Sequence, residues 1–361
     1  MPSVLPNERF LFVACYTQGN GNGLLRFRFD YSTGQIEAAG SFEAGMNPSF
    51  FVFDESRARL YVVNRGRNTS AEGIISSFAV NPEEGELTLI DRVPSGGAGP
   101  CYVGIDRRGC HVLASNYLEG TVTIVPVAED GRFIGSGQTI LHHGRGPHVS
   151  RQQAPHPHSI HADPSNRFVL VPDLGTDRVV IYRLDEEQGR LLENEAGSCA
   201  VAPGAGPRHL CFAPEGTMFF LLNELDSTAS SISLDPDTGS CRVLATASTL
   251  PEGFSEESIA ADVHLAPNGL LYASNRGHNS IVVFAVDAAS GRLKQIGHVS
   301  TRGKTPRNFL IDSTGRWMLV ANQDSDSLVV LRIDGETGMP ELNSIWEGIR
   351  SPVCMGFIPA P

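Results

Sequence analysis

NPSFFVFDESRARLYVVNRG, residues 47–66, places two short apolar runs on either side of a turn and closes the second run with an asparagine. This pattern predicts a strand, a tight turn and a second strand. It recurs five more times, as GPCYVGIDRRGCHVLASNYL (99–118), HPHSIHADPSNRFVLVPDLG (156–175), GPRHLCFAPEGTMFFLLNEL (206–225), IAADVHLAPNGLLYASNRG (259–277) and TPRNFLIDSTGRWMLVANQD (305–324). Such a repeat indicates an array of similar structural units.

The spacing within the repeat is nearly constant. In five copies a proline precedes the closing Asn or Asp by sixteen residues, and in the sixth Ala260 precedes Asn275 by fifteen. The proline-anchored pairs are Pro48 and Asn64, Pro100 and Asn116, Pro157 and Asp173, Pro207 and Asn223, and Pro306 and Asn322. Most copies continue into an alternating strand, a D-x-x-x-G turn and a fourth strand. Four strands recurring every 46–57 residues are typical of β-propeller blades.

The two ends of the chain supply a seventh blade. SPVCMGF (351–357) has the pattern of a first strand, and residues 9–17, 23–30 and 35–42 have the pattern of the other three. A blade built from both ends closes the ring and leaves no open sheet edge. We therefore predict an all-β fold with no helix of note. The chain, residues 1–361, forms one domain, a seven-bladed β-propeller closed by a blade shared between the N- and C-termini.

The composition is that of an acidic globular protein. With a net charge of −12 the average surface repels nucleic acids and anionic membranes, so neither is expected as a partner. The seven cysteines are dispersed without a CxxC pair, which favours free thiols in a reducing compartment. The sequence shows no transmembrane or signal-peptide pattern. We expect a cytoplasmic protein, and the sequence indicates no particular oligomeric state.

In a propeller the first strand of each blade lines the central channel and the second runs back beside it. Residues that begin first strands and residues that end second strands therefore meet at one mouth of the channel. The first set is Ser49, Cys101, His158, Arg208, Ala261, Arg307 and Val353, and the second is Asn64–Arg65, Asn116–Tyr117, Asp173, Asn223–Glu224, Asn275–Arg276 and Asn322–Gln323. One His, three Arg and one Glu come from four consecutive units. Because Arg binds phosphate or carboxylate bidentately, this set predicts an anion site.

Structural roles are the alternative for several of these residues. Asn and Asp at strand ends are commonly turn formers, which is the preferred interpretation of Asn64, Asn116, Asp173 and Asn322. Arg208 and Glu224, sixteen residues apart in one unit, could form a purely structural ion pair.

Six of the eleven histidines lie between His142 and His161. His156 and His158 fall on one face of a strand and could begin a metal site, for which Asp262, His264 and Glu224 are candidate third ligands. The mouth is nevertheless richer in Arg than in carboxylates, and these positive charges would repel a cation. We therefore predict no metal. His158 heads its strand at the mouth, where an imidazole can transfer a proton, and His161 is expected to be a core residue.

The motifs RQ…PHPHSIHADP, VPDLGTDRVVIY, GAGPRHLCFAPEG, LLNELDST, AADVHLAPNG, LYASNRG and TPRNFLIDSTG together resemble the seven-bladed propeller lactonase family. That family includes bacterial 6-phosphogluconolactonases and the fungal 3-carboxy-cis,cis-muconate lactonizing enzyme. The resemblance implies catalytic roles for His158, Arg208, Glu224 and Arg276, and it also matches His209, Arg307 and the pair Arg151–Gln152. One departure is Asn64–Arg65, where many relatives have Asn-Glu.

The resemblance implies hydrolysis of a sugar lactone, 6-phosphoglucono-1,5-lactone first, within carbohydrate metabolism and the pentose phosphate pathway. In this hypothesis Glu224 or His158 is the base, Arg208 or Arg276 stabilises the oxyanion, and Arg307 holds the phosphate of a small anionic substrate. The remaining expected substrate contacts are His209, His156, Asn275 and Arg151. Neither cofactor nor metal is required. The alternatives are a cycloisomerase acting on a carboxylated muconate and a non-catalytic propeller that binds proteins.

Overall fold

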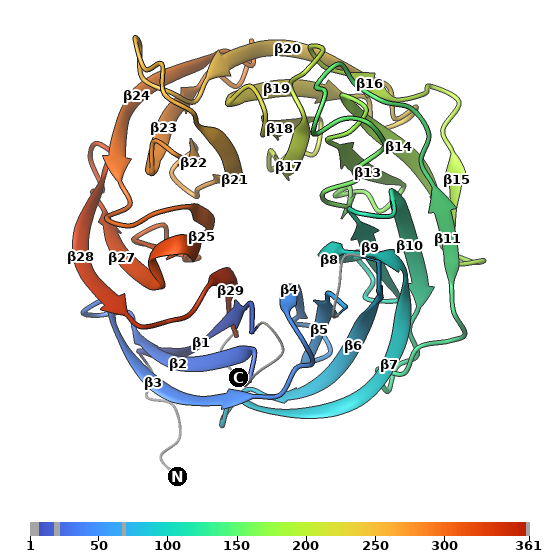
Figure 1. Cartoon of the computed structure of the whole chain (residues 1–361), viewed down its shortest axis with the longest axis horizontal. Coiled ribbons are helices and arrows are strands. Elements are labelled where there is room, and N and C mark those ends of the chain that lie inside the picture. The colour runs from blue at the N-terminus through green and yellow to red at the C-terminus, as the bar shows by residue number, and fades with distance from the viewer. Residues whose placement is uncertain (1–6, 18–21, 67–69, 359–361) are drawn as a thin grey trace.

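The computed structural model describes residues 7–17, 22–66 and 70–358 and contains seven antiparallel sheets arranged in a ring (Figure 1). The seven-bladed propeller predicted from the repeat is confirmed. In the described part of the chain the only helical segment is the 3-10 turn η1 (Gln323–Ser325). No helix there is long and apolar enough to cross a membrane.

Each blade consists of strands ordered from the channel outward, and the blades are numbered from the first complete one. Blade 1 contains β4 (Pro48–Asp54), β5 (Arg59–Asn64), β6 (Glu72–Asn81) and β7 (Glu86–Ala98). Blade 2 contains β8 (Pro100–Ile105), β9 (His111–Asn116), β10 (Thr121–Pro126) and β11 (Gln138–Leu141). Blade 3 contains β12 (His161–Ala162), β13 (Phe168–Asp173), β14 (Arg178–Asp185) and β15 (Arg190–Glu193), with β16 (Cys199–Ala200) also paired to β14.

The remaining blades follow the same plan. Blade 4 contains β17 (Pro207–Phe212), β18 (Met218–Asn223), β19 (Thr228–Leu234) and β20 (Cys241–Ser248). Blade 5 contains β21 (Ile259–Leu265), β22 (Leu270–Arg276), β23 (Ser280–Val286) and β24 (Leu293–Ser300), and blade 6 contains β25 (Pro306–Ile311), β26 (Trp317–Asn322), β27 (Ser327–Ile333) and β28 (Pro340–Glu347). Blade 7 contains β29 (Pro352–Phe357), β1 (Glu8–Cys15), β2 (Leu24–Asp30) and β3 (Gln35–Phe42).

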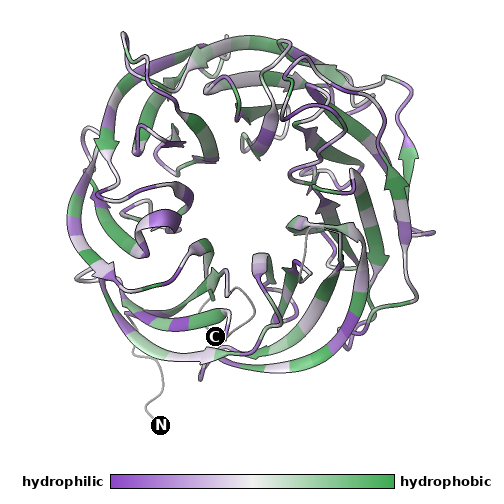
Figure 2. Cartoon of the chain, in the orientation of Figure 1, coloured by the Kyte–Doolittle hydropathy of each residue, from purple (hydrophilic) through white to green (hydrophobic). Residues whose placement is uncertain are grey.

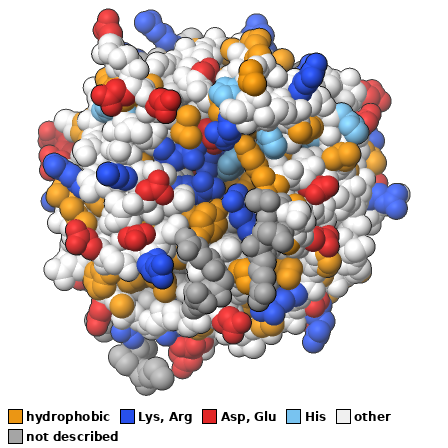
Figure 3. Space-filling view, in the orientation of Figure 1, with side chains coloured by type: hydrophobic (Ala, Val, Ile, Leu, Met, Phe, Trp, Pro, Cys, Tyr) orange, Lys and Arg blue, Asp and Glu red, His pale blue; other side chains and the backbone are white. Residues whose placement is uncertain are grey.

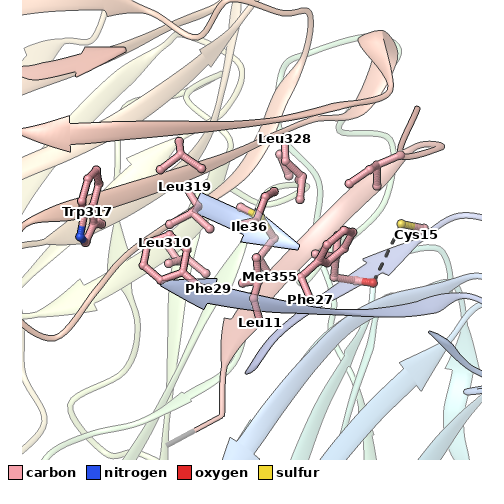
Figure 4. Close-up of a cluster of buried hydrophobic side chains, with 14 residues drawn as sticks. Leu11, Cys15, Phe27, Phe29, Ile36, Leu310, Trp317, Leu319, Leu328 and Met355 are labelled. Carbon is pink, nitrogen blue, oxygen red and sulfur yellow. Dashed lines mark hydrogen bonds between the residues drawn. The ribbon is translucent and has the colours of Figure 1, made fainter. Parts of the chain in front are cut away.

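The two ends of the chain pair in blade 7, as the sequence predicted. Strand β29 lies against β1 in antiparallel register, with Leu11 opposite Phe357 and Val13 opposite Met355. Figure 4 shows the apolar cluster that this blade forms with blade 6, which includes Met355 and Leu11 from blade 7 and Trp317 from blade 6. The closing strand therefore completes both a sheet and an interblade core.

Seven apolar clusters, one at each junction between neighbouring blades, make up the core. Strands with apolar residues on both faces supply them, because each blade is covered by a neighbour on either side. Figure 2 shows these apolar stretches along the strands, with hydrophilic residues gathered in the connections. The apolar material is thus spread around the ring, and the channel wall is left available for polar side chains.

Aspartates fix the tight turns between first and second strands. The carboxylate of Asp312 accepts hydrogen bonds from the backbone N–H groups of Arg316 and Trp317, and Gly315 adopts a positive φ of 71° in the same turn. Asp106 and Asp163 hold the equivalent turns in the same way. This is the usual role of Asp in turns, and it explains the D-x-x-G element of the repeat.

The first strands carry β-bulges at the mouth of the channel. In blade 4 the pairing shifts between Pro207 and His209, so that Arg208 is the extra residue of the bulge. Equivalent shifts follow Pro48, Pro100 and Pro306. Because a bulge re-aims a side chain, the irregularity after these four prolines sets the direction of the residue that follows each of them, Arg208 and Arg307 included.

Candidate active site

The residues suited to catalysis and anion binding lie at one mouth of the channel. Residues that end or directly follow the second strands form a ring there, consisting of Tyr16, Arg65, Tyr117, Leu174, Glu224, Arg276 and Gln323. The bulge residues of the first strands, among them Arg208 and Arg307, lie at the same level. Figure 3 shows basic side chains gathered in the hollow at the centre of this face, although the chain as a whole carries a net charge of −12.

Glu224 is the centre of the site. Its Oε1 accepts a hydrogen bond from Arg151 Nη2 at 2.6 Å, and its Oε2 lies 3.0 Å from Arg208 Nε and 2.9 Å from Arg276 Nη2. The carboxylate side chain is only 2% exposed. The structure therefore unites three predicted arginines around one predicted carboxylate, which is more than the simple Arg208–Glu224 pair that was the structural alternative.

The neighbouring charges keep the carboxylate of Glu224 and the guanidinium groups around it ionised at neutral pH. Burial by itself raises the pKa of Glu224, but the charges of Arg276, Arg208 and Arg151 outweigh burial and lower the pKa to about 2. Burial together with repulsion from Arg276 lowers the pKa of Arg208 to about 9. Glu224 is thus ionised at neutral pH with both oxygens occupied, and it is poorly suited to accept a proton.

His158 lies beside the cluster, with Nε2 at 4.0 Å from Glu224 Oε2 and Nδ1 at 4.0 Å from the thiol of Cys101. Burial, then the charges of Arg208 and its neighbours, lower the pKa of His158 well below 6.5. The imidazole is therefore neutral at physiological pH, with a lone pair available. The carboxylate of Glu224 partly offsets the repulsion that a proton on this imidazole would meet from the arginines.

Arg151 reaches Glu224 from the irregular segment between β11 and β12. Its neighbour Gln152 is fully buried and anchors that segment, because its amide donates to the carbonyl of Leu174 and to the carboxylate of Asp177. Arg151 Nη2 also donates to the hydroxyl of Tyr117 at 3.2 Å. Gln152 thus fixes the loop, and Arg151 binds Glu224 in the site.

Tyr117 separates two of the predicted histidines. His156 stacks on its ring at 4.4 Å, with Nδ1 hydrogen-bonded to the Tyr117 carbonyl, whereas the ring of His158 meets it edge-on at 5.4 Å. Both imidazoles are therefore placed by one aromatic side chain. The predicted substrate contact of His156 stays a prediction.

His209 is held by a second buried carboxylate. Its Nδ1 lies 2.7 Å from Asp262 Oδ1, and Asn308 donates to the other oxygen of Asp262 at 2.6 Å. Burial, then the charge of Arg208, lower the pKa of His209 to about 4, so Nδ1 carries the proton and donates. The ring packs at 5.3 Å from that of His158. His209 therefore supports the wall against which His158 rests, and its predicted contact with substrate stays a prediction.

Arg276 and Arg307 line a pocket of about 460 Å³ between blades 5 and 6. Arg276 Nη2 also donates to the carbonyl of Ala260 at 2.8 Å, while its buried Nε has no hydrogen-bond partner among the described residues. Arg276 is the arginine of the Glu224 cluster that borders this open space. Arg208, 1% exposed, is enclosed behind it and also donates to the carbonyl of Ala261.

The asparagines at the strand ends are structural. Asn275 is fully buried; its amide nitrogen donates to the carbonyl of Thr249 and its amide oxygen accepts from the hydroxyl of Thr249, and its predicted substrate contact stays a prediction. Asn64, Asn116 and Asn322 bond the carbonyls of the loops that enter their blades in the same manner. Their amides tie neighbouring segments together.

One further predicted residue is His161, and the expectation that the site needs no metal stays a prediction. His161 contacts the hydroxyl of Tyr102 at 3.3 Å, and burial lowers its pKa to about 3, so it is a neutral wall residue. No group of three or more His, Cys, Asp or Glu side chains suited to a metal ion occurs among residues 7–17, 22–66 and 70–358. The oxygens of Glu224 already hold three guanidinium groups, which leaves this carboxylate ill-suited to a cation.

A pocket of about 510 Å³ lies away from this mouth, between blades 2 and 3, and contains His142. His142 Nδ1 lies 2.7 Å from Asp173 Oδ2, and its Nε2 lies 3.0 Å from the hydroxyl of Tyr182. These groups satisfy one another, and Asp173 further accepts from the backbone N–H of His156. The concentration of histidines in this part of the sequence thus combines structural and site residues.

Sequence reasoning missed Tyr16, which the structure places in the ring of mouth residues. The rule that found Arg65, Glu224 and Arg276 applies to it equally, since Tyr16 directly follows β1, the second strand of blade 7. The signal was hidden because that blade is split between the two ends of the chain.

Comparisons with known proteins agree with this arrangement. The profile of the family described as "Lactonase, 7-bladed beta-propeller" matches residues 10–357. The 6-phosphogluconolactonase of Bacillus subtilis (strain 168) is 32% identical over 348 residues, which cover 96% of this chain and 97% of that protein. That of Formosa agariphila is 33% identical over 334 residues, or 91% of this chain and 93% of that protein. The structure of a periplasmic gluconolactonase from Pseudomonas aeruginosa has a TM-score of 0.90 at 32% identity, covering 98% of this chain and 100% of that one.

Proposed function

This chain belongs to the seven-bladed β-propeller lactonase family, and on that premise we propose that it hydrolyses 6-phosphoglucono-1,5-lactone to 6-phosphogluconate. The observation that carries the proposal is a neutral imidazole, His158, beside a carboxylate held by three arginines. Hydrolysis of a lactone needs a proton acceptor for water and a cation for the oxyanion, and this mouth offers both to an anionic substrate.

His158 is the base in the proposed mechanism. Water attacks the lactone carbonyl carbon while Nε2 of His158 accepts its proton, and the carbonyl oxygen becomes an oxyanion stabilised by Arg276. Collapse of this intermediate breaks the bond from the carbonyl carbon to the ring oxygen, which takes the proton back from His158 as it becomes a hydroxyl. The new carboxylic acid ionises and releases a proton to solvent.

Glu224 organises the charges in this mechanism. It balances Arg151, Arg208 and Arg276 in the resting protein, and it stabilises the imidazolium formed at His158. Arg276 is better placed than Arg208 to meet the oxyanion, because Arg276 borders the open pocket while Arg208 is enclosed. Arg307, on the same pocket, holds the phosphate.

The activity is tested with freshly prepared 6-phosphogluconolactone, with and without a chelator. We expect a rate above spontaneous hydrolysis that the chelator does not change, and in Arg276→Met a kcat about 100-fold lower, because one oxyanion donor is lost. Arg292→Met removes an exposed arginine from the outer part of the same blade and should match wild type. A wild-type rate equal to the spontaneous one contradicts the proposed substrate, and unphosphorylated and muconate-type lactones are then the next to assay.

The pH dependence follows from the lowered pKa of His158. The base is active when neutral, so kcat/KM should stay level at neutral pH and decline only below 6.5, as the imidazole becomes protonated. The measurement is the pH profile of kcat/KM after subtraction of spontaneous hydrolysis. A decline centred above 6.5 contradicts the assignment of this buried imidazole.

The proposal extends to the setting of the enzyme. We place it in the cytoplasm, acting on a small anionic lactone in carbohydrate metabolism at the lactone-hydrolysing step of the pentose phosphate pathway. The seven cysteines are all free thiols, which suits a reducing compartment. A fractionation experiment that follows activity and an intact chain to the cytosol supports this placement, and recovery outside the cytoplasmic membrane contradicts it.

A further inference from the structure

Two arginines at the mouth lie around one tyrosine and form no ion pair with Glu224. Tyr16 belongs to blade 7, and Arg65 and Arg307 come from its neighbours, blades 1 and 6. The guanidinium carbons of Arg65 and Arg307 lie 5.4 Å and 5.9 Å from the centre of the Tyr16 ring. This group therefore occupies the arc of the ring formed by blades 6, 7 and 1, whereas the Glu224 cluster occupies blades 3 to 5.

No ion pair joins either arginine to a carboxylate among the described residues, and the charges of Glu224 and Asp262 act on Arg307 only at longer range. Glu224 is committed to three other guanidinium groups, and the segments outside the described ranges contain no Asp or Glu side chain. The hydroxyl of Tyr16 and Nε of Arg65 are buried without a hydrogen-bond partner in the described part of the chain. Buried hydrogen-bond donors of Tyr16 and Arg65 that lack acceptors thus lie together at this part of the mouth.

Such an arrangement is costly without an anion. Contact with an aromatic face stabilises each cation but does not neutralise it, and two like charges around one ring repel each other. A phosphate monoester carries nearly two negative charges and three acceptor oxygens at neutral pH, and it matches two guanidinium groups and one hydroxyl in both charge and hydrogen bonding.

We propose that Tyr16, Arg65 and Arg307 form a clamp for the phosphate of the substrate and that Arg65 makes the enzyme selective for phosphorylated lactones. This inference rests on the proposed lactonase function and deepens it. Arg307 connects the two arcs, because it lines one pocket together with Arg276. A substrate held by its phosphate at Tyr16 would direct its lactone ring toward Arg276 and His158.

The clamp predicts a change in selectivity when Arg65 is replaced. In Arg65→Met the ratio of kcat/KM for 6-phosphogluconolactone to that for glucono-1,5-lactone should decrease at least 30-fold, mainly through KM, because a charge-assisted bond to phosphate is lost. Arg65→Lys should recover part of the ratio, and Tyr16→Phe, which removes only the hydroxyl, should lower it several-fold. Arg92→Met is the matched control, because Arg92 lines the same small pocket as Arg65, is exposed and lies outside the clamp.

Binding of glucose 6-phosphate, measured by calorimetry against glucose, separates this inference from the lactonase proposal. The clamp predicts that wild type binds the phosphate ester and that Arg65→Met binds it at least 30-fold more weakly, even if no lactone is hydrolysed. Equal losses of kcat/KM for both lactones in Arg65→Met would overturn the clamp, as would glucose 6-phosphate binding that is absent in wild type or unaffected by the substitution. Absence of lactone hydrolysis together with Arg65-dependent binding would sink the proposed function alone.

Discussion

Glu224→Gln should reduce kcat/KM by at least 1000-fold and lower the free energy of unfolding by about 3–5 kcal/mol. The substitution keeps the shape of the side chain but removes the only negative charge among Arg151, Arg208 and Arg276. Arg208 is then a buried cation without its ion-pair partner, and Arg276 keeps only its hydrogen bond to the carbonyl of Ala260. Circular dichroism and thermal unfolding, measured beside the kinetics, distinguish a damaged fold from a damaged site.

Glu257→Gln provides the control for this prediction. Glu257 is an exposed carboxylate on the same mouth, without an ion pair among the described residues, so its loss should change stability by less than about 0.5 kcal/mol. A Glu224→Gln protein as stable as wild type would contradict the view that this carboxylate neutralises buried charge.

The stability contribution of Glu224 should also depend on pH. Because its folded-state pKa of about 2 lies below the ordinary value of 4.5, its contribution is fully present above pH 4.5 and is lost as the pH falls from there toward 2. The difference in unfolding free energy between wild type and Glu224→Gln should therefore narrow over this range of pH. If this difference in unfolding free energy stayed constant down to pH 2, the charge of Glu224 would not be the origin of its contribution to stability.

His158→Gln should reduce kcat by about 1000-fold while KM changes little. The amide can occupy the space of the imidazole, but it cannot accept and return a proton, and general-base catalysis contributes about 100- to 10,000-fold. The acid limb of the pH profile should vanish with the imidazole. Steady-state kinetics over the pH range of the wild-type profile measure both effects.

His161→Gln applies the same change three residues along the chain. His161 contacts Tyr102 rather than the Glu224 cluster, and glutamine can retain a hydrogen bond to that hydroxyl, so activity should stay within about threefold of wild type. If His158→Gln kept more than a tenth of the wild-type kcat, the base would have to be sought elsewhere.

The fold could be predicted from sequence because the repeat encodes it locally. Each turn is specified by residues within it, such as Asp312 with Gly315, and each strand by its apolar pattern. The sixteen-residue spacing from Pro207 to Asn223 corresponds to a direct pairing in the sheet. The split blade followed from counting strands, since the C-terminal end of the chain has the pattern of one strand and the N-terminal end has the pattern of the other three.

The repeat could predict those site residues that occupy equivalent positions in successive units. Arg208, Glu224 and Arg276 sit at repeat positions and meet as expected. The repeat could not show that the amide of Asn275 donates a hydrogen bond to Thr249, because the loop that carries Thr249 is not part of the repeat pattern. The course of the loop bearing Arg151 likewise depends on long-range contacts, which Gln152 makes with Leu174 and Asp177.

The sharing of blade 7 has a consequence for protein synthesis. Strand β1 leaves the ribosome before the other six blades are made, whereas β29, which covers its inner edge, follows all of them. At 5–20 residues per second the interval is on the order of tens of seconds, during which the nascent chain displays an unpaired strand edge and half of an interblade core. Translation speed and chaperone occupancy thus bear on the yield of this enzyme more than on that of a protein whose sheets are each contiguous in sequence.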